Sequence, residues 1–167
     1  MCIRDRLRPS TTGVYSLQPS FKKVPKYANH ITIPKAFKLN GYTTSTMGKI
    51  YHSALPKGEF DKSGSRPPLP NRFPEKKLVN TPKNHRLVDW GIWPPKDSDQ
   101  LDYKTADWAV NELSQMPKDP FFMAVGFFRP HVPLYASQEW FDQYPEDSLI
   151  LPLIRRDDRE DTPLFSW

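Results

Sequence analysis

The residues best suited to chemistry in this sequence are Lys49, His52 and His131, and each stands in a short, distinctive segment. Lys49 and His52 lie three residues apart in the segment GKIYH, and His131 lies between two prolines in RPHVP. On a helical or turn-like segment, a spacing of three places two side chains on one side. A lysine ammonium and an imidazole in that arrangement can bind an oxyanion and move a proton. The pattern therefore favours an anion-handling active site.

Each of these residues also has an ordinary structural interpretation. GKxxH by itself is more commonly a surface lysine beside a packed histidine, and His131 is equally explained as a histidine that hydrogen-bonds a neighbouring carbonyl in a tight turn. Zinc is disfavoured because no third ligand of suitable spacing accompanies the two histidines. His30 and His85 stand in polar surroundings and are predicted to be surface residues.

Two runs that precede these segments are typical of buried β-strands. Residues 42–47 are rich in β-branched and aromatic residues, and residues 120–128 are almost wholly apolar, as expected of a strand covered on both faces. In open parallel sheets, ligands bind outside the carboxyl ends of the strands. If both strands run parallel in one sheet, we expect Lys49, His52 and His131 to converge at one edge.

Two helices are predicted to flank these strands. Thr32 caps the first helix, which runs over residues 33–40 and stops at Gly41. Asp102 caps the second helix. Its apolar positions recur at three-to-four spacing: Ala106, Ala109, Val110, Leu113 and Met116.

A third, short helix is predicted after Ser137, carrying Trp140, Phe141 and Tyr144 and ending at Pro145. Helices that alternate with strands predict an α/β fold with a mostly parallel sheet flanked by helices.

Residues 53–100 hold eight prolines and show no sustained period, which predicts a long Pro-rich loop insertion. Near its end, the run DWGIW supplies aromatic residues that can anchor the loop.

The composition narrows the class of protein. The chain has 167 residues, and its formal charge of +5 permits anionic partners without requiring them. With 5 Trp, 7 Tyr and 10 Phe, the chain has too many aromatic residues for a disordered protein. No apolar run is long enough to span a membrane, and no nucleic-acid-binding signature is present. The charged run at residues 155–161 is predicted to be a solvated loop of internal ion pairs.

The beginning of the chain differs from the rest. Residues 1–6 match neither a signal peptide nor a regular element, and they are predicted to be a non-native leader. We therefore expect a longer native chain, of which residues 7–167 are an internal piece. Cys2 is the single cysteine, which excludes an internal disulfide framework.

Four segments, taken in order, resemble the sulfatase family, and most closely its iduronate-2-sulfatase-like branch. They are LRPSTTGVY at residues 7–15, GYTTSTMGKIYH at 41–52, the Asp-Trp-Ala of 107–109, and PFFMAVGFFRPHVP at 120–133. The ordered set is more specific than any single motif. On this resemblance, residues 7–167 are part of a sulfatase catalytic domain.

The resemblance implies an alkaline-phosphatase-like α/β fold. It also implies hydrolysis of sulfate esters by a formylglycine, made from the cysteine of a Cys-x-Pro-Ser-Arg motif, with the help of a calcium ion. It implies that Lys49 and His131 contact sulfate oxygens and that His52 contacts the formylglycine hydroxyls. Cys2 is out of register with that motif, so we expect the formylglycine cysteine and the calcium ligands to lie outside this chain. The chain alone is accordingly expected to be inactive.

The expected substrate is a sulfated small molecule or a sulfated polysaccharide such as a glycosaminoglycan, and the family is typical of periplasmic, secreted or lysosome-like compartments. Two other functions stay open. A phosphate- or phosphonate-ester hydrolase of the same superfamily is the alternative within the enzyme class. A non-catalytic module that binds sulfated glycans would explain the positive charge and the tryptophans.

Overall fold

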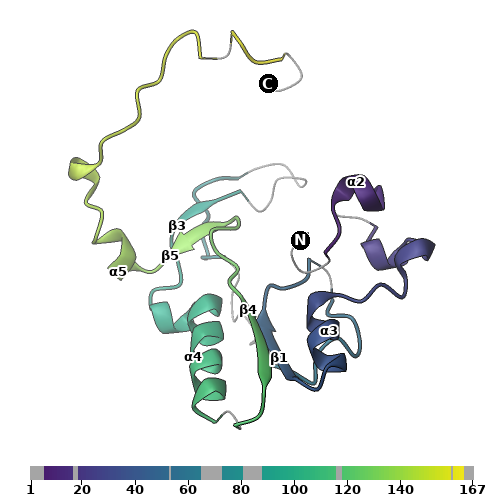
Figure 1. Ribbon diagram of the computed structural model, residues 1–167. Helices are drawn as coiled ribbons and strands as arrows, with labels where there is room; N and C mark the ends of the chain where they lie inside the picture. Colours follow the sequence, from purple (N-terminus) through teal and green to yellow (C-terminus); the bar gives the residue numbers. More distant parts are fainter. Residues whose placement is uncertain are drawn as a thin grey trace.

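The computed structural model describes residues 6–16, 19–52, 54–64, 73–80, 88–115, 118–158 and 160–163, and Figure 1 shows their arrangement. In chain order, with η marking 3-10 helices, the elements are α2 (Pro9–Thr12), η1 (Phe21–Lys23), η2 (Pro25–Tyr27), α3 (Ile33–Leu39), β1 (Thr43–Gly48), β2 (Lys62–Ser63), β3 (Trp90–Ile92), η4 (Asp97–Asp99), α4 (Leu101–Ser114), β4 (Phe121–Gly126), β5 (Leu134–Ala136), α5 (Gln138–Phe141) and η5 (Glu146–Ser148). None of the described helices is long and apolar enough to cross a membrane.

Within the described residues, three parallel strands form the main sheet, in the order β2-β1-β4. β1 pairs with β4 along its whole length, from Thr43 opposite Phe121 to Gly48 opposite Gly126. The prediction that these two strands run parallel in one sheet is confirmed. Their carboxyl ends therefore lie at the same edge of the sheet, and the chain reaches Lys49 directly beyond that edge.

The two long strands differ in burial from the prediction. In β1, residues 44–47 are buried although three of the four side chains are polar. The prediction that the second strand is covered on both faces is wrong, because β4 is only half-buried and its first residue, Phe121, is exposed. The cause is the strand order: β1 is central, whereas β4 lies at an edge of the described sheet.

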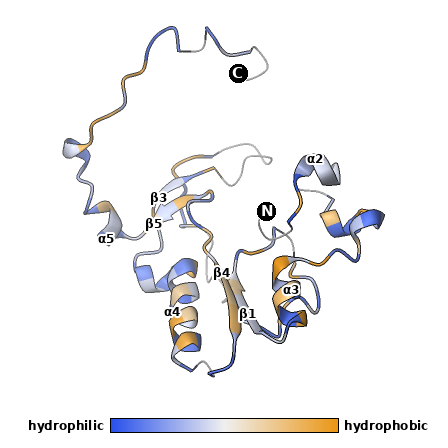
Figure 2. Ribbon diagram, viewed as in Figure 1, coloured by the Kyte–Doolittle hydropathy of each residue, from blue (hydrophilic) through white to orange (hydrophobic). Residues whose placement is uncertain are grey.

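Helices α3 and α4 lie on opposite sides of the sheet (Figure 1). The Thr32 hydroxyl accepts a hydrogen bond from the backbone N–H of Lys35 at 3.4 Å, which confirms the predicted cap of α3. Phe37 of α3 stacks on Phe122 of β4, with ring centroids 4.5 Å apart. Figure 2 shows the resulting hydrophobic layer along β4, between the two helices.

Helix α4 differs from the prediction in its cap and in its buried face. The N-cap residue is Gln100, and Asp102 is the second residue of the helix. The buried residue of α4 is Thr105, whereas Val110 and Leu113 are exposed. A Cβ atom on Gly48 would lie only 3.1 Å from the Thr105 Cγ2 atom, so the helix approaches the end of β1 closely. The apolar spacing of the sequence could not show which face makes this approach.

The Pro-rich segment contains short strands that its sequence pattern does not predict. β2 joins the main sheet beside β1, and β3 pairs in parallel with β5 in a second, two-stranded sheet. The buried carboxylate of Asp89 anchors this second sheet, since it accepts hydrogen bonds from two backbone N–H groups and from the Tyr135 hydroxyl. Of the two tryptophans predicted to anchor this segment, Trp90 is exposed and Trp93 is half-buried, and the Asp89 carboxylate is an anchor that the sequence pattern did not indicate.

The last described residues run away from the rest of the molecule (Figure 1). Ser137 stands at the N-cap position of α5, but its hydroxyl donates to the Glu139 carboxylate instead of capping the helix. The helix ends at Phe141, so the predicted member Tyr144 lies beyond it. Arg155 and Asp157 form an ion pair at 2.7 Å, as predicted for the mixed-charge run.

Candidate active site

Two glycines bring the chain segment of Lys49 against the end of β4. Gly48 has φ of +85°, and the next residue, Lys49, donates its backbone N–H to the Gly126 carbonyl at 2.6 Å. A Cβ atom on Gly48 would lie 2.0 Å from that carbonyl oxygen, and a Cβ atom on Gly126 would lie 2.4 Å from the Lys49 carbonyl oxygen. Only glycine fits at both positions, because the two backbones are in contact.

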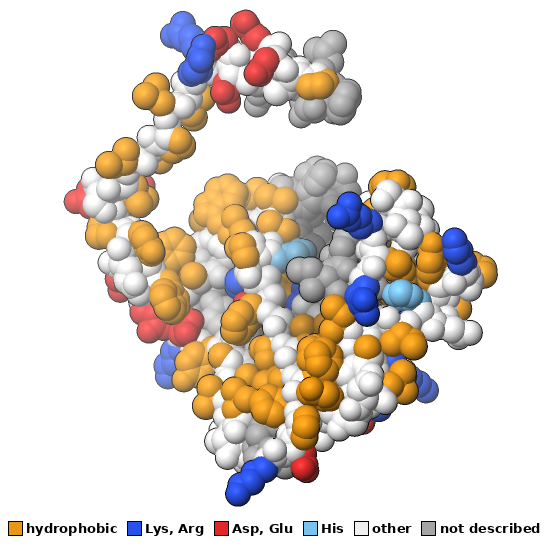
Figure 3. Space-filling view, in the orientation of Figure 1, with side chains coloured by type: hydrophobic (Ala, Val, Ile, Leu, Met, Phe, Trp, Pro, Cys, Tyr) orange, Lys and Arg blue, Asp and Glu red, His pale blue; other side chains and the backbone are white. Residues whose placement is uncertain are grey.

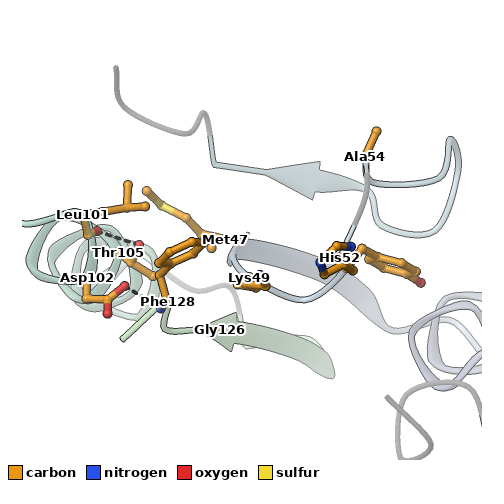
Figure 4. Close-up of a pocket in the computed structure, with 11 residues that line it drawn as sticks. Met47, Lys49, His52, Ala54, Leu101, Asp102, Thr105, Gly126 and Phe128 are labelled. Atoms are coloured by element: carbon orange, nitrogen blue, oxygen red, sulfur yellow. Dashed lines mark hydrogen bonds between the residues drawn. The ribbon is translucent and has the colours of Figure 1, made fainter. Parts of the chain in front are cut away.

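A pocket of about 440 Å³ opens at this edge of the sheet (Figure 4). Lys49 and His52 both line it, together with Tyr51, Asp102 and Phe128. Lys49 is half-buried and His52 is exposed. Among the residues that the structure describes, neither the Lys49 ammonium nor the His52 ring makes a side-chain hydrogen bond, so the hydrogen-bonding capacity of both is available to a ligand in the pocket.

His131 is not among the residues that line this pocket, but one aromatic ring connects it to Lys49. The Phe128 ring centroid lies 4.7 Å from the Lys49 Nζ atom and 4.9 Å from the centroid of the His131 ring. A lysine ammonium at this distance from an aromatic face makes a cation–π contact. The structure therefore brings Lys49 and His52 into one pocket and places His131 beside it, against Phe128.

The His131 ring is oriented by its own turn. Its Nδ1 atom lies 2.7 Å from the Val132 carbonyl oxygen, and because a carbonyl only accepts, Nδ1 carries the proton. This is the hydrogen bond to a neighbouring carbonyl that the structural interpretation of His131 predicted. It is compatible with chemistry, since it leaves Nε2 of the exposed ring as the nitrogen that can accept or return a proton.

The turn that carries His131 is held by two charged side chains. The Asp102 carboxylate accepts the backbone N–H groups of Phe128 and Arg129, at 2.7 and 2.8 Å. The Arg129 guanidinium donates to the carbonyl oxygens of His131, at 3.0 Å, and of Pro133. The sequence pattern missed the contact of Asp102, because 26 residues separate it from Phe128 and its place near a helix start suggested a cap.

The buried carboxylate of Glu59 holds Tyr51, one of the residues that line the pocket. The Tyr51 hydroxyl donates to Glu59 at 3.1 Å, and the same carboxylate, only 2% exposed, also accepts from Lys22 and Thr32. Burial raises the pKa of Glu59, but the hydrogen bonds from Lys22, Thr32 and Tyr51 and the lysine charge outweigh burial and lower it overall. Glu59 is therefore an ionised structural group that fixes the residue next to His52.

The remaining predicted residues do not join the site. His30 is half-buried rather than fully at the surface, and its ring meets those of Phe21 and Tyr27 edge-on. His85 and Cys2 lie outside the described residues. Within the described ranges, no group of three or more His, Cys, Asp or Glu side chains could hold a metal ion, so these residues do not fit a calcium site.

Comparison with known proteins gives one consistent family. The family model described as Sulfatase matches residues 2–150. A sulfatase from Formosa agariphila is 39% identical over 176 aligned positions, which cover 96% of this chain and 34% of that protein. Human iduronate 2-sulfatase is 28% identical over 86% of this chain and 28% of its own length. An arylsulfatase from Clostridium perfringens is 38% identical over 29% of this chain. The chain thus spans about a third of its relatives at most.

Proposed function

The chain belongs to the sulfatase family, with its alkaline-phosphatase-like fold, and from this premise we propose that the complete protein hydrolyses sulfate esters at the pocket of Lys49 and His52. The observation that carries the proposal is the presence of these two side chains, without hydrogen-bond partners among the described residues, in one pocket at the carboxyl ends of β1 and β4. This is the edge where parallel sheets bind their ligands.

The roles follow from the charge that develops when sulfate leaves an alcohol. The Lys49 ammonium would stabilise negative charge on the sulfate oxygens, and His131, whose ring contacts the same Phe128 ring, would add a donor from Nε2 when that nitrogen also carries a proton. The family resemblance supports this pair as sulfate-binding residues and His52 as the partner of the formylglycine hydroxyls. We assign no cysteine to formylglycine and no ligand to calcium in this chain, and propose that the chain in isolation is inactive.

We propose a carbohydrate sulfate ester as the substrate. Support comes from the similarity to the human and mouse iduronate 2-sulfatases, each aligned over 86% of this chain. The exposed position of His52 agrees with a substrate that is larger than an inorganic anion.

An activity panel on the complete protein tests this function. We expect release of sulfate from 4-nitrophenyl sulfate and from sulfated oligosaccharides, with little release of phosphate from 4-nitrophenyl phosphate. Faster release of phosphate would instead support the phosphate-ester alternative. Binding of a sulfated oligosaccharide without any hydrolysis would support the non-catalytic module. Either of these two results contradicts the proposal.

A further inference from the structure

The carboxylate of Asp102 joins helix α4 to the turn that follows β4. Its two oxygens accept from two consecutive backbone N–H groups, those of Phe128 at 2.7 Å and Arg129 at 2.8 Å. Hydrogen bonds to an ionised acceptor are the stronger kind, and a pair from one carboxylate fixes direction as well as distance. Asp102 thus determines where the backbone of Phe128 lies relative to α4.

The position of Phe128 in turn affects both sulfate-binding candidates, Lys49 and His131. The same ring contacts the Lys49 ammonium and the His131 imidazole. Arg129, the second residue held by Asp102, donates to the His131 carbonyl. A displacement of this turn would therefore move both sulfate-binding candidates together.

The location of Asp102 is otherwise unfavourable for an anion pocket. Asp102 is one of the residues that line the pocket with Lys49, and an unpaired carboxylate there would repel a sulfate group. Two N–H donors and its place in the first turn of α4 offset part of that negative charge. Helix capping does not explain the residue, since Gln100 is the N-cap and the Asp102 oxygens bond the turn instead.

We propose that Asp102 is a positioning residue of the active site, which sets Lys49 and His131 for catalysis by holding the backbone of Phe128 and Arg129. The inference rests on the proposed function, because positioning matters only if Lys49 and His131 act on the substrate. A misplacement of about 1 Å at such groups lowers a rate by about 100-fold.

The test compares Asp102→Asn with Asp107→Asn in the complete protein. Asp107 lies on the same helix, exposed, and accepts a hydrogen bond from Asn111 at 3.3 Å. We expect Asp102→Asn to lower kcat for 4-nitrophenyl sulfate by about 10- to 100-fold, with a smaller change in KM, and Asp107→Asn to stay within about twofold of the wild type. In a background that already carries Lys49→Ala and His131→Ala, Asp102→Asn should change kcat by less than about twofold, because the groups it positions are gone.

Different results distinguish a failure of this inference from a failure of the proposed function. If Lys49→Ala and His131→Ala lower the rate but the folded Asp102→Asn variant keeps its kcat, the inference alone is overturned. An equal loss in both backgrounds would also overturn it, because Asp102 would then act independently of the two residues. If Lys49→Ala and His131→Ala keep the wild-type rate, both proposals fail. Should Asp102→Asn not fold, Asp102→Ser serves instead, because it also removes the carboxylate that holds the two backbone N–H groups, and a wild-type kcat for that variant overturns the inference.

Discussion

At the scale of single residues, Glu59 shows how a buried charge can organise a site without touching the substrate. Its carboxylate holds Lys22, Thr32 and Tyr51 together, and Tyr51 lines the pocket beside His52. A buried carboxylate is stable only when such partners offset its loss of hydration. The three partners lower the pKa of Glu59 although burial alone would raise it.

This lowered pKa predicts a pH-dependent effect of Glu59→Gln. A carboxyl group whose pKa is lower in the folded state stabilises the fold fully above its unfolded pKa, near 4.5, and loses that contribution as the pH falls through the folded value. We expect Glu59→Gln to lower the free energy of unfolding at pH 7 by about 1 to 3 kcal/mol. The difference from the wild type should shrink below about pH 4.5.

Thermal or urea unfolding at a series of pH values measures this difference. Glu146→Gln is a suitable control, because Glu146 lies exposed at the start of η5. A difference between wild type and Glu59→Gln that stays constant from pH 7 down to pH 3 would contradict the account.

The candidate site residues could be predicted from the sequence, but the residues that hold them in place could not. Lys49, His52 and His131 stand out in the sequence because their spacing and flanking residues suit an anion site. Asp102 and Glu59 could not be recognised, since their partners are up to 37 residues away and ordinary roles on a helix or a loop explained them equally well.

At the scale of elements, the contact between the ends of β1 and β4 fixes the site. The composition of the two strands predicted their existence and their parallel direction, which the structure confirms. It could not give the register, in which Gly48 lies opposite Gly126, because register depends on contacts between residues far apart in sequence. The same limit explains why the pairing of β3 with β5 was not foreseen.

The glycine contact predicts a large difference between two alanine substitutions. Gly48 and Gly41 have similar positive φ angles, +85° and +82°, but a Cβ atom meets the Gly126 carbonyl only at Gly48 and open space at Gly41. Gly41→Ala should cost about 1 kcal/mol of stability, the usual penalty of a left-handed backbone. Gly48→Ala should cost at least about 2 kcal/mol more, because the backbone cannot shift without breaking the Lys49 hydrogen bond.

Unfolding curves of the two variants, recorded side by side, measure this difference in free energy. Equal losses of stability would show that the close approach of Gly48 and Gly126 is relaxed in solution, which would contradict the geometry proposed for the pocket.

At the scale of the whole molecule, the chain exposes much apolar surface. Figure 3 shows hydrophobic side chains gathered over the strands and α4 and along the last described segment. Ile150 and Leu153 are 97% and 95% exposed. Exposed apolar surface of this extent usually marks an interface. The sequence predicted the α/β fold correctly, because strand and helix patterns alternate, but it could not predict how much of this surface stays open.

The central claim is that the carboxyl ends of β1 and β4 form a sulfate-binding active site around Lys49, His52 and His131. Sulfate release from 4-nitrophenyl sulfate by the complete protein tests it most directly, with folding of each variant checked by thermal unfolding. Lys49→Ala and His131→Ala should each lower the rate by about two to four orders of magnitude, and His52→Ala should also slow turnover. Lys118→Ala, exposed before the opposite end of β4, should keep the wild-type rate. Wild-type rates for folded Lys49→Ala and His131→Ala variants would contradict the claim.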